Sequence, residues 1–398
     1  MAKIAFVCLT FHWPPLGGAW VEEKELLTNL SEFHDVYLIV PEYQKFFPRG
    51  KIRGDMPFEV IKIPFNSFTF NFYNVSKRIR SVIEKINPDY IIFGEGGVLK
   101  PYIINELKDY PVILRFYSAS VWCFNQNYFR SGCLCNNTMR NFFLKCTICN
   151  LTLNNNDRRH EYLGSLGFFP SYLTSLEKCY KSARGIIVYN EEIKKSLVGF
   201  NKNIMVIPGG VDISRFTPNN SNYKKEEKKV RIFMSGRSDD PAKGLHILKE
   251  ACYILKDYGL NFKIDITWSC DNIPKLGEFI NVNNWIEQED LPRFYQEGDI
   301  CVVPSIWPEP FGITAVEAMS CGVPVIASRI GGLQGIVEDG VTGFLFEPGN
   351  SKELARKLRI LISEREIRNY MGKKARERVE KFFNWDLIFR KHYLNLFE

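Results

Sequence analysis

Several common sequence features are missing from this 398-residue chain, and each absence excludes a class of protein. No apolar run approaches the roughly 18 residues that a membrane-spanning helix needs. The first residues, Met-Ala-Lys-Ile-Ala-Phe-Val-Cys, read as a strand and lack the pattern of a signal peptide. No basic stripe interleaved with aromatic residues marks a nucleic-acid-binding module. We therefore expect a cytoplasmic protein with reduced cysteines that does not bind nucleic acid.

One absent motif and the net charge bear on which cofactors and partners the protein can bind. No G-x-G-x-x-G motif follows the first strand of either expected domain, which argues against an oxidoreductase that binds NAD or a flavin. The formal net charge of +7 is moderate. It fits a solvated basic surface, and equally contact with an anionic lipid or an anionic acceptor.

The chain does contain short apolar strands that alternate with helical stretches, and this pattern starts twice. It predicts an α/β fold, with two Rossmann-like, doubly wound domains facing across a cleft. We place the N-terminal domain at residues 1–207, with a cysteine-rich insertion at 123–149, and expect a C-terminal helix at 384–398 to complete it. The C-terminal domain then spans residues 208–383.

The most specific pattern lies in residues 304–328, P-S-I-W-P-E-P-F-G-I-T-A-V-E-A-M-S-C-G-V-P-V-I-A-S. It reads as a Pro-rich loop after a buried strand, a helix that starts near Gly312, and another apolar strand. Glu309 and Glu317 flank the start of this helix, where free backbone N–H groups form an anion site. A carboxylate, a phosphate site and a second carboxylate in this order suit a sugar, a diphosphate and a ribose.

The stretch from Glu309 to Glu317 resembles the E-x7-E signature of the retaining GT-B glycosyltransferases of family 4, the "glycosyl transferases group 1". Residues 236–244 resemble the G-R-x-x-x-x-K-G loop of the same family, and residues 205–218 resemble its crossover between domains. The resemblance covers nearly the whole chain and is strongest from 204 to 348.

The resemblance implies transfer of a sugar from a UDP- or GDP-sugar to a hydroxyl acceptor, with an α-linkage. Arg237 and Lys243 would bind the diphosphate, where preorganised cations stabilise the growing charge of the leaving group. Glu317 would hold the ribose and Glu309 would contact the sugar, so the predicted catalytic residues are Glu309, Arg237 and Lys243. The other predicted donor-binding residues are Phe311, Gly312, Ile313, Thr314, Gly236, Gly17, Gly18 and Tyr117.

The sequence has no D-x-D motif, which disfavours a metal-dependent GT-A mechanism, so we expect no catalytic cofactor. The acceptor implied by the resemblance is a glycan or a lipid-linked molecule of cell-envelope polysaccharide or glycolipid synthesis. Peripheral contact with the inner face of the membrane is one interpretation of the basic amphipathic helix expected at 75–86; packing on the domain's own core is the other.

Two departures from the family pattern keep other functions open. Tyr117 stands where related enzymes usually have a histidine that contacts the donor sugar, and Gly209 replaces an asparagine. A tyrosine can still form a hydrogen bond with a sugar hydroxyl. The alternatives are a catalytically silent GT-B protein that acts as a binding scaffold, and an isomerase that acts on a nucleotide-sugar.

The insertion contains two cysteine pairs, Cys133 with Cys135 and Cys146 with Cys149. Two such pairs are the usual source of the four ligands of a structural zinc site, and Cys123 is a fifth candidate. The alternative is that these thiols stay free and pack as small apolar groups.

Overall fold

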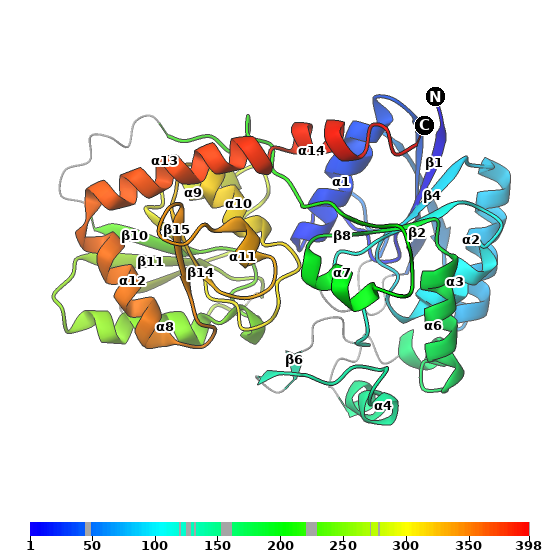
Figure 1. The fold of residues 1–398 in the computed structure, drawn as a ribbon, viewed down its shortest axis with the longest axis horizontal. Coiled ribbons are helices and arrows are strands. Elements are labelled where there is room, and N and C mark those ends of the chain that lie inside the picture. The colour runs from blue at the N-terminus through cyan, green and yellow to red at the C-terminus, as the bar shows by residue number, and fades with distance from the viewer. Residues whose placement is uncertain are drawn as a thin grey trace. The chain divides into compact units, whose positions relative to one another are not determined.

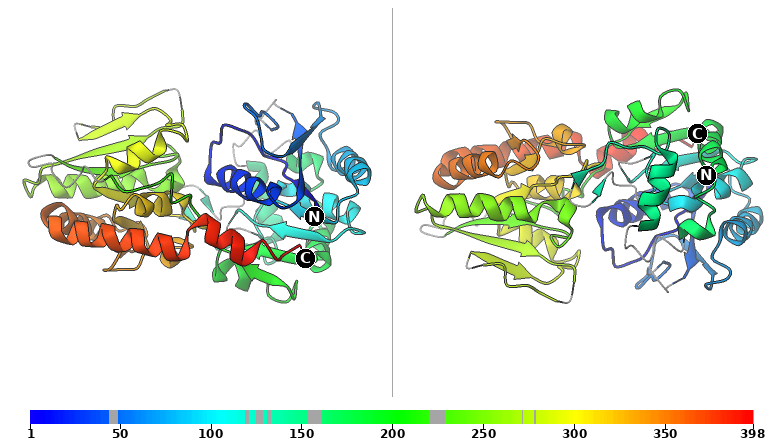
Figure 2. Two further views of the ribbon diagram at one scale, coloured as in Figure 1. Left: turned by 90° about the horizontal axis from the view of Figure 1, so that it is seen from above. Right: turned by 90° about the horizontal axis from the view of Figure 1, so that it is seen from below.

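The computed structural model of the protein describes residues 1–43, 49–118, 121–124, 129–130, 133–152, 161–219, 229–270, 272–277 and 279–397. The chain divides into two compact units, which Figures 1 and 2 show as ribbons. The first unit comprises Met1–Tyr128, Cys135–Ile207 and His392–Glu398. The second comprises Phe129–Leu134 and Pro208–Lys391.

The first unit is built on a parallel seven-stranded sheet in the order β3-β2-β1-β4-β5-β8-β9. Its strands are β1 (Lys3–Val7), β2 (Asp35–Glu42), β3 (Glu59–Pro64), β4 (Tyr90–Phe93), β5 (Val112–Arg115), β8 (Gly185–Val188) and β9 (Ile204–Val206). The central strands are almost entirely buried, because helices cover both faces of a parallel sheet. The short antiparallel pair of β6 (Phe129–Arg130) and β7 (Cys133–Leu134) comes after β5 in the chain but belongs to the second unit.

The helices of the first unit are α1 (Gly18–Ser31), α2 (Phe72–Ile86), α3 (Lys100–Glu106), α4 (Phe143–Thr152), α6 (Ser171–Ser182) and α7 (Glu191–Leu197). Helices α2, α3 and α6 pack side by side in that order (Figure 1). Asn190 caps helix α7, because its side chain accepts a hydrogen bond from the amide of Ile193 at 2.9 Å. Helix α2 begins earlier than predicted because Asn71 caps it, accepting from the amide of Asn74 at 3.0 Å.

The second unit has a parallel six-stranded sheet in the order β12-β11-β10-β13-β14-β15. Its strands are β10 (Val230–Met234), β11 (Phe262–Thr267), β12 (Ile280–Asn283), β13 (Ile300–Val303), β14 (Val325–Ser328) and β15 (Gly343–Phe346). Its helices are α8 (Leu245–Lys256), α9 (Leu291–Gln296), α10 (Ile313–Ser320), α11 (Leu333–Ile336), α12 (Ser351–Ser363), α13 (Arg365–Phe382) and α14 (Trp385–His392).

Two layers of helices enclose the second sheet. Helices α8 and α12 pack together on one face, while α10 contacts both α9 and α13 on the other (Figure 1). Leu248, Leu255 and Leu358 lie fully buried between the first layer and the strands. The predicted α/β class with two doubly wound parallel sheets is therefore confirmed.

Helix α13 crosses the turn after α10 at Gly372, where the two backbones touch. A Cβ atom at Gly372 would lie 2.1 Å from the carbonyl oxygen of Gly322. We therefore expect Gly372→Ala to lower the free energy of unfolding by about 1–3 kcal/mol in urea denaturation. Gly335→Ala in α11 is the matched control, because a Cβ there meets nothing within 4 Å. Equal stability of the two variants would show that this close packing is wrong.

Candidate functional site

The candidate site of the second unit lies where β10 and β13 end. These strands are neighbours, but the chain moves from β10 to β11 on one side and from β13 to β14 on the other. Such a reversal opens a crevice at the carboxyl edge of the sheet, and open α/β sheets bind ligands there. The segments that follow the two strands, 235–244 and 304–312, contain the predicted site residues Lys243 and Glu309.

The main electrostatic feature of this edge is the ion pair of Lys243 and Glu309. Nζ of Lys243 lies 2.6 Å from Oε1 of Glu309. The same oxygen accepts hydrogen bonds from Oγ of Ser305 at 2.7 Å and from Nε1 of Trp307 at 3.0 Å. The Glu309 side chain is 9% exposed and that of Lys243 is 24% exposed. Three donors on one oxygen hold the carboxylate in a fixed orientation.

Glycines let the backbone come close enough to build this arrangement. Gly244 has φ 77°, and a Cβ there would lie 2.0 Å from the carbonyl oxygen of Pro304. The amide of Gly332 donates to the carbonyl oxygen of Glu309 at 2.7 Å, and a Cβ at Gly332 would lie 2.6 Å from the carbonyl oxygen of Phe311. Glycine at both positions therefore fixes the loop that carries Glu309.

Helix α10 starts directly after this loop. Its N-cap, Gly312, has φ 118° and supplies no side-chain cap to the first turn. The first turn includes the amides of Ile313 and Thr314, which point along the helix axis toward its N-terminus. The position of a Cβ at Gly236 lies 4.0 Å from Oγ1 of Thr314, so the loop after β10 borders this helix start. The arrangement can accept an anion.

Glu317 lies one turn further into α10 and has a different environment. It is buried, and Oη of Tyr295 donates to its Oε2 at 2.7 Å. The Tyr295 hydroxyl also lies 2.6 Å from Oγ of Ser235. Burial raises the pKa of Glu317 to about 7, while the Tyr295 hydrogen bond and Arg215 act in the opposite direction. The Glu317 carboxylate therefore accepts further hydrogen bonds most readily above neutral pH.

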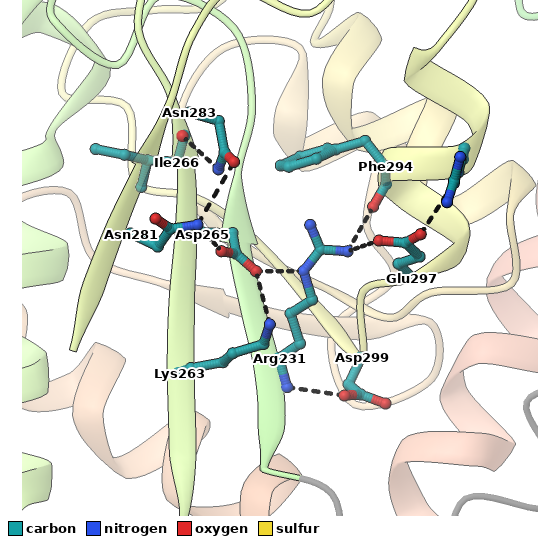
Figure 3. Close-up of polar contacts among 10 residues, drawn as sticks. Arg231, Lys263, Asp265, Ile266, Asn281, Asn283, Phe294, Glu297 and Asp299 are labelled. Atoms are coloured by element: carbon teal, nitrogen blue, oxygen red, sulfur yellow. Dashed lines mark hydrogen bonds and ion pairs between the residues drawn. The ribbon is translucent and has the colours of Figure 1, made fainter. Parts of the chain in front are cut away.

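A buried polar network positions α9, the helix that carries Tyr295 (Figure 3). Arg231 on β10 pairs with Asp265 on β11, and its Nη1 donates to the carbonyl oxygen of Phe294 at 3.2 Å. Asn281 donates to the other oxygen of Asp265 at 2.8 Å. These bonds hold the pKa of Asp265 below its ordinary value, although burial alone would raise it. The network thus ties α9 to the sheet next to Tyr295.

Arg237 is the most exposed of the predicted catalytic residues. Its side chain is 49% exposed and lies 3.6 Å from Asp240. Gly236 before it has φ 97°, and its carbonyl oxygen accepts from Oγ1 of Thr267 at 2.6 Å. In the structure, Lys243 contacts Glu309, whereas Glu317 contacts Tyr295 instead. Arg237 lies in the same loop as Lys243, after β10, and is exposed to solvent.

The remaining predicted donor contacts belong to the first unit. Gly17 is the N-cap of α1, which Gly18 begins, and it has extended backbone. Tyr117 follows β5, and its amide donates to Oε1 of Glu95 at 3.2 Å. Its hydroxyl is buried and has no hydrogen-bond partner among the residues that the structure describes. Burial raises the pKa of Tyr117 well above its ordinary value.

A buried cluster of charged side chains near Tyr117 was not predicted from the sequence. Arg115 at the end of β5 pairs with Glu22 of α1, and the hydroxyl of Tyr189 donates to Glu22 at 2.6 Å. Beside them, burial raises the pKa of Glu23 well above its ordinary value. In the sequence, the one indication of this group is Arg115, a charged residue at the end of an apolar strand. Ser305, Trp307 and Tyr295 were missed as well, although the first two precede Glu309 in the motif itself.

Four of the five insertion cysteines have described side chains, and that of Cys133 lies outside the described residues. Cys123, Cys135, Cys146 and Cys149 all lie in the first unit, and each is half-buried. Within the described part of the chain, no three Cys, His, Asp or Glu side chains already form a metal-ligand set. Nor is any helix there both long and apolar enough to cross a bilayer.

Comparison with known proteins gives consistent similarities. The family model "Glycosyl transferases group 1" matches residues 274–378. The uncharacterized glycosyltransferase MJ1178 of Methanocaldococcus jannaschii is 33% identical over 388 residues, which cover 95% of this chain and 93% of that protein. Sulfoquinovosyl transferase SQD2 of Arabidopsis thaliana is 33% identical over 188 residues, but these cover 44% of this chain and 36% of that relative.

Among solved structures, HepE of Anabaena in complex with UDP-glucose is similar over most of its length. The match covers 98% of both chains, with a TM-score of 0.69 and 16% sequence identity. At this identity the likeness concerns the fold.

The raised pKa of Glu317 predicts how stability changes with pH. The folded carboxyl keeps its proton up to about pH 7, whereas its ordinary pKa is 4.5, so the fold loses stability as pH rises between these values. The full loss is about 3 kcal/mol. Glu317→Gln should therefore be more stable than the wild type at pH 8 by about that amount, with little difference at pH 5.

The measurement is urea denaturation at both pH values. Glu289→Gln is the matched control, because Glu289 is exposed in the same unit. A Glu317→Gln effect that is equal at pH 5 and pH 8 would contradict the buried, protonated state.

Proposed function

Since this chain belongs to the glycosyltransferases of group 1, we propose that it moves a sugar from a nucleotide-diphosphate donor, a UDP- or GDP-sugar, to a hydroxyl acceptor. Its two doubly wound units give it the GT-B fold. The observation that carries the proposal is the Lys243–Glu309 pair beside the start of α10, at the strand-order reversal. The complex of HepE with UDP-glucose supports a nucleotide-sugar donor.

The donor diphosphate would bind at the start of α10. The amides of Gly312, Ile313 and Thr314 offer donors without a competing side-chain cap, and Phe311 leads into this turn. Lys243 and Arg237 supply cations on the adjacent loop. Cleavage of the sugar–phosphate bond increases the negative charge of the leaving diphosphate, and cations that are already in place stabilise it.

Glu317 would hold the ribose. Its carboxylate can accept hydrogen bonds from ribose hydroxyls, while Tyr295 occupies one position on Oε2. Glu309 would orient the sugar ring and would not act as a nucleophile. The leaving phosphate would help to remove the acceptor proton on the same face, which retains the configuration and gives an α-linkage. No step needs a metal cofactor.

The first unit would contribute the acceptor side. Gly17, Gly18 and Tyr117 of this unit are the proposed donor contacts, and the Tyr117 hydroxyl, which has no hydrogen-bond partner among the described residues, would bind a sugar hydroxyl in place of a histidine. We propose a glycan or lipid-linked acceptor of cell-envelope polysaccharide or glycolipid synthesis. We propose with it a cytoplasmic location, at the inner face of the membrane when the acceptor is lipid-linked. The net charge of +7 supports contact with anionic surfaces.

Titration calorimetry with intact UDP-, GDP- and ADP-sugars tests the donor proposal. We expect one nucleotide-sugar to bind, with affinity reduced at least tenfold in Lys243→Ala and Glu317→Gln because a cation or a hydrogen-bond acceptor is lost. Binding by the wild type should weaken below about pH 7 as Glu317 gains its proton. The pH dependence should disappear in Glu317→Gln, whose side chain does not titrate.

Glu289→Gln is again the control and should bind as the wild type does. If no nucleotide-sugar binds the folded wild type, the transferase proposal fails and the scaffold alternative takes its place. Binding followed by release of free nucleotide without any acceptor would favour the isomerase alternative.

A further inference from the structure

Helix α4, at the periphery of the first unit, exposes apolar side chains instead of burying them (Figure 1). Leu144, Ile148 and Leu151 are 72%, 50% and 37% exposed, and their spacing of four and then three residues places them on one face of the helix. The opposite face buries the polar residues Thr147 and Asn150. A helix that packs on a core shows the reverse pattern, so the apolar face of α4 points to solvent.

A second segment of the first unit, residues 161–169, has the same character. Large apolar side chains are exposed there as well, namely Leu163, Phe168 and Phe169. Phe124 joins the two segments, because its ring centroid lies 6.1 Å from that of Phe143 at the start of α4 and 5.0 Å from that of Tyr162. The exposed side chains of both segments therefore border one aromatic cluster, and we call them together the α4 surface.

The sequence around α4 carries cations without carboxylates. Residues 110–156 contain no Asp or Glu, while Arg140 and Lys145 are exposed. Arg140 lies 3.6 Å from Glu177 of α6. Nζ of Lys145 lies 5.8 Å from the centre of the Phe142 ring, so the aliphatic part of this lysine can cover apolar surface while its ammonium group stays hydrated.

No carboxylate is exposed on the described residues of the α4 surface. Glu161, the acidic residue of the second segment, is buried and pairs with Arg49 at 2.8 Å. An exposed apolar patch by itself suits either a protein or a membrane. Apolar side chains beside a lysine, with no acid among them, match the anionic headgroups and the acyl boundary of a bilayer. Charge complementarity therefore favours a lipid surface.

We propose that the α4 surface docks on an anionic lipid bilayer, with its apolar side chains at the acyl boundary and Lys145 among the headgroups. Helix α4 has ten residues, a length of about 15 Å, and is too short to cross a bilayer, so it would lie in the plane of the interface. Docking would bring a lipid-linked acceptor to the first unit, which would bind it. This role rests on the proposed function, whereas the docking itself does not.

Helix α2, for which membrane contact was one interpretation of the sequence, differs from α4 in both respects. Its apolar side chains are buried, namely Val75, Ile79 and Ile83. Its cations are paired with acids, since Lys77 lies 3.1 Å from Glu106 and Arg80 lies 2.7 Å from Glu84. The bilayer contact that we propose therefore lies at α4 and not at α2.

Co-sedimentation of the full chain with lipid vesicles tests the proposal. We expect binding to vesicles of phosphatidylcholine and phosphatidylglycerol in equal amounts, and weaker binding to phosphatidylcholine alone or at high salt. Ile148→Asp should lower the partition coefficient about tenfold, because an apolar side chain is lost from the interface. Lys145→Gln should lower it about fivefold on the anionic vesicles and change it little on neutral ones.

Each variant has a matched control. Leu387→Asp changes a leucine of similar exposure on α14 of the second unit, and Lys77→Gln removes an exposed lysine from α2. Both controls should bind vesicles as the wild type does. Circular dichroism verifies that each variant is folded before its binding is compared.

Failure of the folded wild type to bind anionic vesicles would overturn the proposal. Loss of binding in Lys77→Gln but not in Ile148→Asp would do so as well. A dimer in sedimentation velocity that Ile148→Asp dissociates would also overturn it, because the α4 surface would then join two copies of the chain. Vesicle binding is measured without donor or acceptor, and nucleotide-sugar binding without lipid, so either proposal can fail while the other holds.

Discussion

The ion pair between Lys243 and Glu309 is the interaction on which the site of the second unit depends. It joins the loop after β10 to the loop after β13, across the point where the strand order reverses. A nearly buried carboxylate without its cation would be strongly unfavourable. The pair therefore holds both loops in place and keeps an ammonium group at Glu309, on the loop that leads into α10. In the proposed function, the donor diphosphate would share this ammonium group with Glu309.

The two glutamates of the motif, Glu309 and Glu317, lie in different environments. Glu309 faces an ammonium, a hydroxyl and an indole N–H, whereas Glu317 is buried against the Tyr295 phenol. Distinct surroundings let two identical side chains perform different tasks in one site. The network around Arg231 and Asp265 supports the second of them, because it fixes the helix that carries Tyr295.

The fold and the motif residues were predictable, since both rest on local patterns. The buried strands read as apolar runs, Asn190 reads as a helix cap, and the loop glycines accompany Lys243 and Glu309 in the sequence. The partners of the motif were not predictable in the same way. Tyr295 meets Glu317 from 22 positions away and Glu22 meets Arg115 from 93, so only the folded chain brings them together.

The proposed function requires the donor diphosphate to lie at the start of α10, beside Lys243. The most direct measurement is a crystal structure of the full chain with the nucleoside diphosphate that binds it most tightly. We expect phosphate oxygens within hydrogen-bond distance of the Ile313 and Thr314 amides and of Nζ of Lys243, with ribose hydroxyls on Glu317. A nucleotide bound elsewhere, with the Lys243–Glu309 loop untouched, would contradict it.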